Sequence, residues 1–101
     1  MTQSGSDQAA RPQASGPYTV TAYQDANVRS TPYLSGGIVS RVFANNSYPA
    51  NCWTTGDTVT DNGTTSDVWI QLPLDAGGVG YVSAIYLVGN SIANLPESAF
   101  F

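Results

Sequence analysis

Side chains that commonly perform catalysis are scarce in this sequence. Its 101 residues contain neither histidine nor lysine, and the single cysteine is Cys52. No cationic residue lies next to Cys52 in the sequence to lower its pKa and make the thiol a nucleophile. The aspartates from Asp25 to Asp75 are scattered through predicted loops, and their spacing marks no acid–base pair. The sequence therefore predicts a protein that is not an enzyme.

Asp57 and Asp61, with Asn62 beside them, offer the oxygen ligands that calcium prefers. The stretch lacks the alternating acids and the bidentate glutamate of a calcium-binding loop, so we expect these aspartates to cap turns. We predict neither a metal site nor a cofactor. For Cys52 we expect a buried thiol that behaves as a small hydrophobe. The alternatives are a bridge to another chain or to a cysteine beyond this sequence.

The charge balance excludes two classes of partner. The formal net charge is −4, and the three basic residues are arginines. A nucleic-acid binder needs clustered positive charge to neutralise phosphates, and an anionic membrane surface attracts the same kind of cluster. No apolar run approaches the ~20 residues of a membrane-spanning helix. We therefore expect no nucleic acid and no membrane insertion.

The first seventeen residues differ in composition from the rest. They are mainly Gln, Ser, Ala, Gly and Pro, with no large apolar side chain after Met1. Such a segment buries too little surface to offset chain entropy. We predict a disordered linker over residues 1–17, and hence a tethered module. A polar start without a signal segment fits a cytosolic start or, better, a piece of a longer exported chain.

The elements that would position any site are strands. Alternating or β-branched residues predict strands at Thr19–Tyr23, Ile38–Phe43, Tyr48–Trp53, Val68–Leu74 and Gly80–Val82. Within the fourth, Val68, Ile70, Leu72 and Leu74 share one face, and Trp69 and Gln71 share the other. Pro49 places the third strand at an edge or a bulge. No segment has a helical period.

Turn-forming residues separate these strands. Arg29–Gly37 and Thr54–Asp67 are predicted loops, and the second contains Asn62 and Gly63, which tolerate the positive φ of a tight hairpin turn. Asp75–Gly78 is predicted to turn the chain into its last antiparallel strand. The spacing of strands and turns predicts an all-β fold, a small barrel or sandwich.

The C-terminal extension, residues 89–101, has no clear strand pattern. Its apolar side chains either pack back on the sheet or dock on a neighbouring molecule, and we expect packing. The residues concerned are Ile92, Leu95, Phe100 and Phe101.

Four segments in order make the chain similar to the bacterial SH3 domain family, in particular its actinobacterial extracellular members. They are Asn27–Pro32, Ile38–Val42, Asp67–Leu72 and Gly80–Leu87, with Cys52–Val59 as a variant stretch. The resemblance implies a small SH3-like antiparallel barrel over residues 18–88, with a 3-10 turn at Ser83–Ile85 before the last strand. Thr31, where glycine is common, and Pro73, where a backbone donor is usual, depart from the pattern.

The resemblance also implies a binding surface. Tyr23, Trp69 and Tyr86 match an aromatic groove that holds extended peptides, and Tyr33 extends it. For Trp69 a place in the core is an equally good interpretation. Asp25 and Asp75 are candidates to hold an amine or a cationic side chain.

The function that the family implies is a secreted or envelope module without catalysis. It would recognise an extended peptide, such as a peptidoglycan stem or cross-bridge, and target its parent protein to the cell wall. The alternative is a structural module that docks to another protein.

Overall fold

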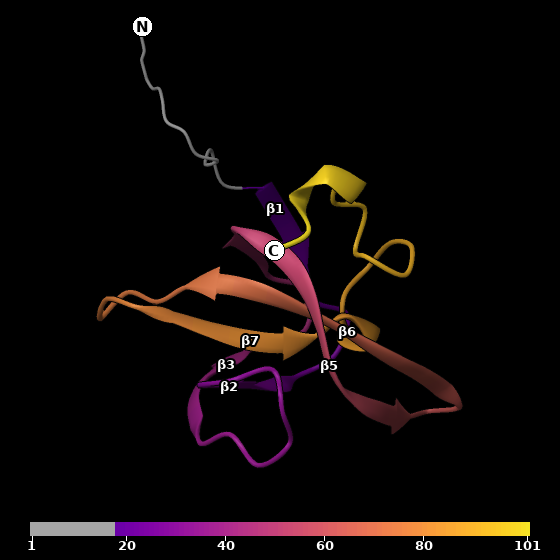
Figure 1. The fold of residues 1–101 in the computed structure, drawn as a ribbon, viewed down its shortest axis with the longest axis horizontal. Coiled ribbons are helices and arrows are strands. Elements are labelled where there is room, and N and C mark those ends of the chain that lie inside the picture. Colours follow the sequence, from indigo (N-terminus) through magenta and orange to yellow (C-terminus); the bar gives the residue numbers. More distant parts are fainter. Residues whose placement is uncertain (1–17) are drawn as a thin grey trace, which may run out of the picture.

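Seven strands form two antiparallel sheets in residues 18–101, the part of the chain that the computed structural model describes (Figure 1). A five-stranded sheet has the order β3-β2-β7-β6-β5, and a two-stranded sheet pairs β1 with β4. The strands are β1 (Tyr18–Thr21), β2 (Ala26–Arg29), β3 (Ile38–Val42), β4 (Ser47–Ala50), β5 (Cys52–Asp61), β6 (Thr64–Pro73) and β7 (Val79–Ser83). Two 3-10 helices, η1 (Ala84–Tyr86) and η2 (Glu97–Ala99), follow β7. The predicted all-β class is confirmed; the linker predicted for residues 1–17 lies outside the described residues.

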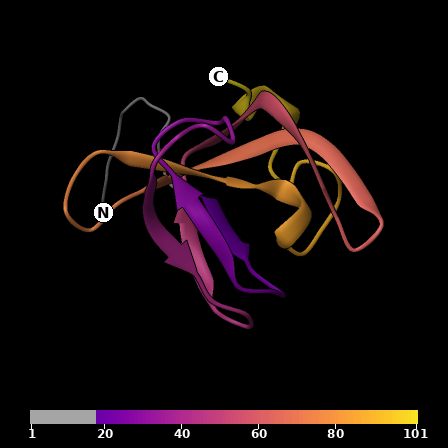
Figure 2. The same ribbon diagram turned by 90° about the horizontal axis from the view of Figure 1, so that it is seen from below.

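A long β5–β6 hairpin dominates the larger sheet. The predicted loop at Thr54–Asp67 is wrong, because most of it continues the two strands up to a tight turn. Threonine suits strands, since its branched side chain packs on a pleated surface, and Thr60 and Thr65 pair across the hairpin with their hydroxyls 2.9 Å apart. The predicted turn is confirmed, with Asn62 and Gly63 both at positive φ. The outer half of the hairpin curves toward η1 (Figure 2).

Strand β6 is covered on both faces. The predicted apolar face is buried in the main core, with exposed fractions of 9% for Val68, 0% for Ile70 and 4% for Leu72. The opposite face carries Trp69, which is buried in a second cluster with Val59 and Ile85. The alternation along β6 is therefore as predicted.

The main core lies between the two sheets. Val20 and Ala50 of the small sheet, together with Ala22 directly after β1, form one side of this core. The large sheet contributes Val28, Val42 and Val82 in addition to the apolar face of β6. A bridge between Ala22 and Leu87 joins β1 to the chain beyond η1. The predicted third strand is divided at Asn51 into β4 and β5. Pro49 lies in β4, which pairs with β1 in a two-stranded sheet and so has the free edge that a proline tolerates.

The one-turn helix lies slightly later than expected. Residues Ala84–Tyr86 form η1, and Ser83 is its N-cap, with its hydroxyl oxygen accepting from the Ile85 N–H at 3.4 Å. It follows β7 instead of preceding a last strand, because the chain after it pairs only through two isolated bridges within the described residues, Ala22–Leu87 and Trp53–Phe100. No helix within residues 18–101 is long and apolar enough to cross a membrane.

The C-terminal extension packs back on the sheet in part. Leu95 is buried and Ile92 packs partly buried against the main core, as expected. Phe100 and Phe101 are 54% and 83% exposed. Figure 1 shows this segment in yellow, beside the beginning of β5.

Candidate functional site

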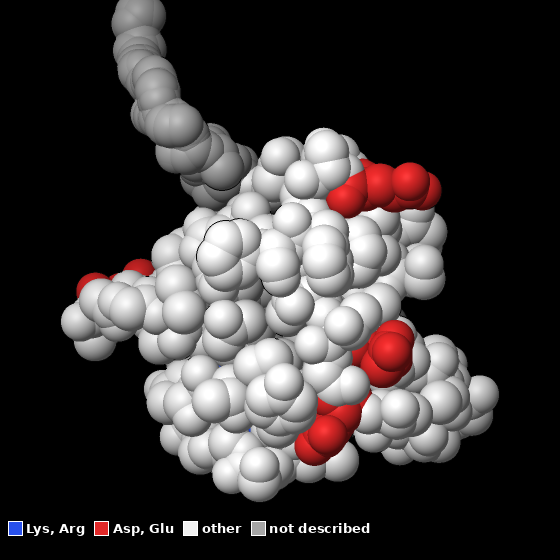
Figure 3. Space-filling view, viewed as in Figure 1, with Lys and Arg blue, Asp and Glu red and all other residues white. Residues whose placement is uncertain are grey.

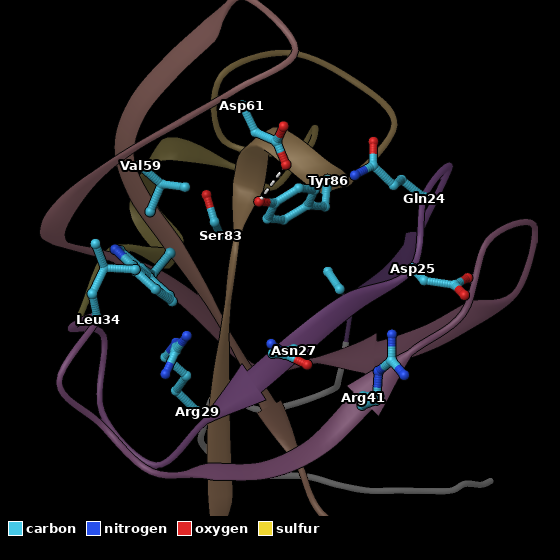
Figure 4. Close-up of a pocket in the computed structure, with 12 residues that line it drawn as sticks. Gln24, Asp25, Asn27, Arg29, Leu34, Arg41, Val59, Asp61, Ser83 and Tyr86 are labelled. Carbon is cyan, nitrogen blue, oxygen red and sulfur yellow. Dashed lines mark hydrogen bonds between the residues drawn. The ribbon is translucent and has the colours of Figure 1, made fainter.

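A pocket of about 170 Å³ opens between the loop after β2, the outer part of the β5–β6 hairpin and η1. Its wall combines two arginines, two aspartates, a tyrosine and neutral polar groups on a small apolar floor (Figure 4). The lining residues are Gln24, Asp25, Ala26, Asn27, Arg29, Leu34, Arg41, Val59, Asp61, Trp69, Ser83 and Tyr86. Two of the three arginines of the chain therefore face one cavity.

Strand pairing places the two arginines in the lining of the same pocket. Arg29 ends β2 and Arg41 lies on β3, where Asn27 is its antiparallel partner. Arg29 donates from Nη1 to the Gly36 carbonyl at 2.9 Å and so fixes the far side of the loop. The Arg41 guanidinium lies 5.6 Å from the centre of the Phe43 ring and is exposed. Arg41 is therefore the basic side chain of the pocket most accessible to a ligand.

The opposite side of the pocket is formed by Tyr86 and Asp61 (Figure 4). The Tyr86 hydroxyl donates to Asp61 Oδ2 at 2.9 Å, which links η1 to the end of β5. Desolvation by burial raises the pKa of Tyr86 to about 12, with further upward effects from the hydrogen bond and from the charge of Asp61. Asp25 is also engaged, because its Oδ1 accepts from the Ala44 N–H at 2.8 Å.

Ionisation of Tyr86 is expected to weaken the fold at high pH. Its folded-state pKa of about 12 lies above the ordinary value of 10, so between these values the folded state holds a proton that the unfolded state has lost. Stability therefore falls as pH rises through this window. We expect an alkaline absorbance titration to show a tyrosinate step near pH 12 that disappears in Tyr86→Phe and moves to lower pH in Asp61→Asn. An unchanged step in Asp61→Asn would contradict the coupling.

The loop between β2 and β3 is fastened to an irregular point of β5. Asp57 Oδ2 accepts from the Leu34 N–H at 2.9 Å, and the Asp57 N–H donates to the Pro32 carbonyl at 3.1 Å. Trp69 lies on the neighbouring strand β6, and its Nε1 donates to the Asp57 carbonyl at 2.9 Å. Asp57 therefore joins the rim of the pocket to its floor. In residues 18–101, no three of the acidic or cysteine side chains gather as metal ligands would.

The residues predicted for the groove do not form one surface. Tyr86 and Asp25 line the pocket, and Trp69 forms part of its floor. The expectation that Trp69 is displayed for a ligand is wrong, because its side chain is only 2% exposed. Its aromatic ring is held by packing on Val59 and Ile85 and serves the core.

The other predicted residues lie elsewhere. Tyr23 is 48% exposed and lines a second cavity beside η1, where its hydroxyl donates to the Ile85 carbonyl. Tyr33 is exposed in the loop after β2 and is absent from the pocket lining. Asp75 lines a third cavity with Arg41 and Pro73.

Six polar lining residues are not among the predicted site residues: Gln24, Asn27, Arg29, Arg41, Asp61 and Ser83. The alternation of side chains along a strand indicates part of this lining, because Asn27 and Arg29 flank the buried Val28 and therefore share the opposite face of β2. Their proximity to Arg41 depends on the β2–β3 register, which the sequence does not display.

Cys52 is half-buried at the start of β5, so full burial is not observed. Burial raises the pKa of its thiol. Because the thiolate is the reactive species, we expect a water-soluble thiol reagent to label Cys52 several-fold more slowly in the folded protein than in urea. Equal rates in the two states would contradict this placement.

Comparison with known proteins identifies a relative of this chain. The chain is 36% identical over 80 residues to the uncharacterized protein YraI of Bacillus subtilis (strain 168), an alignment that covers 73% of this chain and 67% of YraI. No family model matches the chain, and no solved structure matches it. At this identity and coverage, the chain belongs to the same family as the uncharacterized protein YraI.

Proposed function

We propose that this chain is a non-catalytic binding module with an SH3-like barrel that recognises an extended peptide. The sheet arrangement supports the barrel: the β5–β6 hairpin is long and irregular near Asp57, and the Ala22–Leu87 bridge connects the two sheets. A one-turn helix followed by a bridging residue matches the end of the predicted barrel.

The mixed charge of the pocket carries the proposal. Arg29 and Arg41 suit carboxylates, whereas Asp25 and Asp61 suit amines, and Tyr86 offers an amphipathic ring between them. A peptide with both free carboxylates and free amines presents this combination. Peptidoglycan stems and cross-bridges are such peptides, and we propose that the module directs a secreted or envelope protein of a bacterium to them.

The carboxylates of the pocket already have structural partners. Asp61 accepts from Tyr86 and Asp25 accepts from the Ala44 N–H. These hydrogen bonds hold the pocket wall in place. We therefore propose that the two aspartates shape the pocket and supply its negative charge, and we assign no acid–base step to them.

A cosedimentation assay with insoluble cell walls tests the proposal. We expect the full chain to pellet with the walls and Arg41→Gln to pellet several-fold less, because the most accessible positive charge of the pocket is removed. Arg11→Gln, the same change outside the described residues, serves as a matched control. Failure of the full chain to pellet, or equal loss in both variants, would refute binding through this pocket.

An exposed apolar patch favours the alternative, docking to a protein. Exposed fractions are 57% for Ile38, 47% for Val39, 49% for Phe43 and 40% for Val79. Ile38 and Val39 lie on β3, an edge strand of the larger sheet, Phe43 directly follows β3, and Val79 begins β7. An exposed apolar edge strand invites pairing with another chain. Concentration-dependent association that Val39→Lys abolishes would support this second candidate.

A further inference from the structure

A fourth cavity, distinct from the charged pocket, lies between the C-terminal segment and the start of β5. It has a volume of about 430 Å³ and is lined by Trp53, Asn90, Ser91, Ile92, Glu97 and Phe100. None of these residues lines the charged pocket. The fold thus brings together two aromatic rings and a single carboxylate from parts of the chain that are distant in the sequence.

The C-terminal segment holds the aromatic pair in place. The rings of Trp53 and Phe100 have centroids 4.7 Å apart at an interplanar angle of 56°. Trp53 Nε1 donates to the Pro96 carbonyl at 3.2 Å, and the Phe101 N–H donates to the Trp53 carbonyl at 2.9 Å. A further bond from Thr54 Oγ1 to the Phe101 carbonyl measures 3.1 Å. The pair is therefore ordered before any ligand arrives.

The charge at this cavity is negative and comes from Glu97. Glu97 begins η2 and is exposed, and no basic residue lines the cavity. Figure 3 shows acidic side chains on this face, including the one over η2, and almost no basic surface. The chain has no lysine, and within residues 18–101 its two arginines, Arg29 and Arg41, face the other pocket.

We propose that this cavity binds an organic ammonium group from another molecule. A cation over the faces of aromatic rings is attracted by their quadrupoles, and aromatic sites recognise quaternary and methylated ammonium groups in this way. Glu97 supplies the counter-charge. A lone carboxylate is too few ligands for calcium or magnesium, whereas an organic cation uses the apolar wall of Ile92 and Phe100 as well. This inference does not rest on the proposed wall-binding function.

The test is a titration of the full chain with tetramethylammonium, followed by the NMR signal of the Trp53 indole N–H. We expect saturable shifts at Trp53 and weaker binding of tert-butanol, a neutral molecule of similar shape. Butylammonium, a mimic of a lysine side chain, is the second arm; its affinity relative to tetramethylammonium distinguishes a primary amine from a quaternary one as the natural group.

Two variants assign the binding to this cavity. Glu97→Gln and Phe100→Leu are each expected to weaken tetramethylammonium binding about 2- to 5-fold, the size of exposed ion-pair and cation–π contributions. Asp67→Asn removes one charge from an exposed position outside the cavity and should leave the affinity unchanged. Equal binding of tert-butanol, shifts confined to other residues, or an unchanged affinity in Glu97→Gln would overturn the proposal.

Discussion

Replacing Trp69 by alanine is expected to destabilise the protein by about 3–5 kcal/mol, the usual cost of removing a large buried aromatic side chain. The ring is 2% exposed and packs against Val59 and Ile85. Its Nε1 also donates to the Asp57 carbonyl, which would lose this partner. Urea denaturation followed by circular dichroism measures the change in the free energy of unfolding.

Tyr33→Ala is the matched control for this experiment. Tyr33 is an aromatic residue of the same site prediction, but it is 46% exposed in the loop after β2, so its loss should change stability by no more than about 0.5 kcal/mol. If Trp69→Ala unfolds at the same urea concentration as the parent protein, Trp69 is a displayed ligand platform and the core assignment fails.

Gly56→Ala is expected to displace the loop that forms one wall of the charged pocket. An added Cβ at Gly56 would collide with the carbonyl of Pro32, which is backbone and has little freedom to move. The adjacent bond from the Asp57 N–H to the same carbonyl would break. We expect a loss of about 1–3 kcal/mol in stability, as for other overpacked sites, together with loss of ligand binding at the pocket.

Gly37 provides the control for this substitution. It lies at the end of the same loop, has no atom within 4 Å of an added Cβ, and has no positive φ. Gly37→Ala should therefore be neutral or stabilising by up to about 1 kcal/mol. Denaturation curves and the amide signals of Leu34 and Asp57 report the two effects; similar behaviour of both variants would contradict the close contact at Gly56.

Much of the sheet followed from local sequence signals. Alternation in Val68–Leu74 identified the buried face of β6, and Asn62 and Gly63 identified the hairpin turn, since both depend on residues adjacent in the chain. The loop predicted on either side of that turn is wrong, because most of its residues lie in β5 and β6. Its strands are held by cross-strand pairs such as Thr60 with Thr65, and a single segment does not display its partner.

The site was less predictable because it depends on tertiary contacts. The alternation of side chains along β6 places Trp69 on the face opposite the main core. This pattern alone allows the side chain to face either solvent or a second layer of packed residues. The structure supplies the second layer in Val59 and Ile85, which come from the hairpin and from η1. In the same way, the β2–β3 register places Arg29 and Arg41 in the lining of one pocket. Tyr86 was identified through the family resemblance, and its bond to Asp61 required the fold.

Amide chemical shift mapping during titration with a soluble peptidoglycan stem peptide tests the central claim most directly. We expect saturable shifts centred on Asn27, Arg29, Arg41 and Tyr86, which Arg41→Gln weakens and Arg11→Gln does not. Absence of shifts, or shifts confined to Ile38 and Val39 on the edge strand, would contradict the claim that the charged pocket is a peptide-binding site.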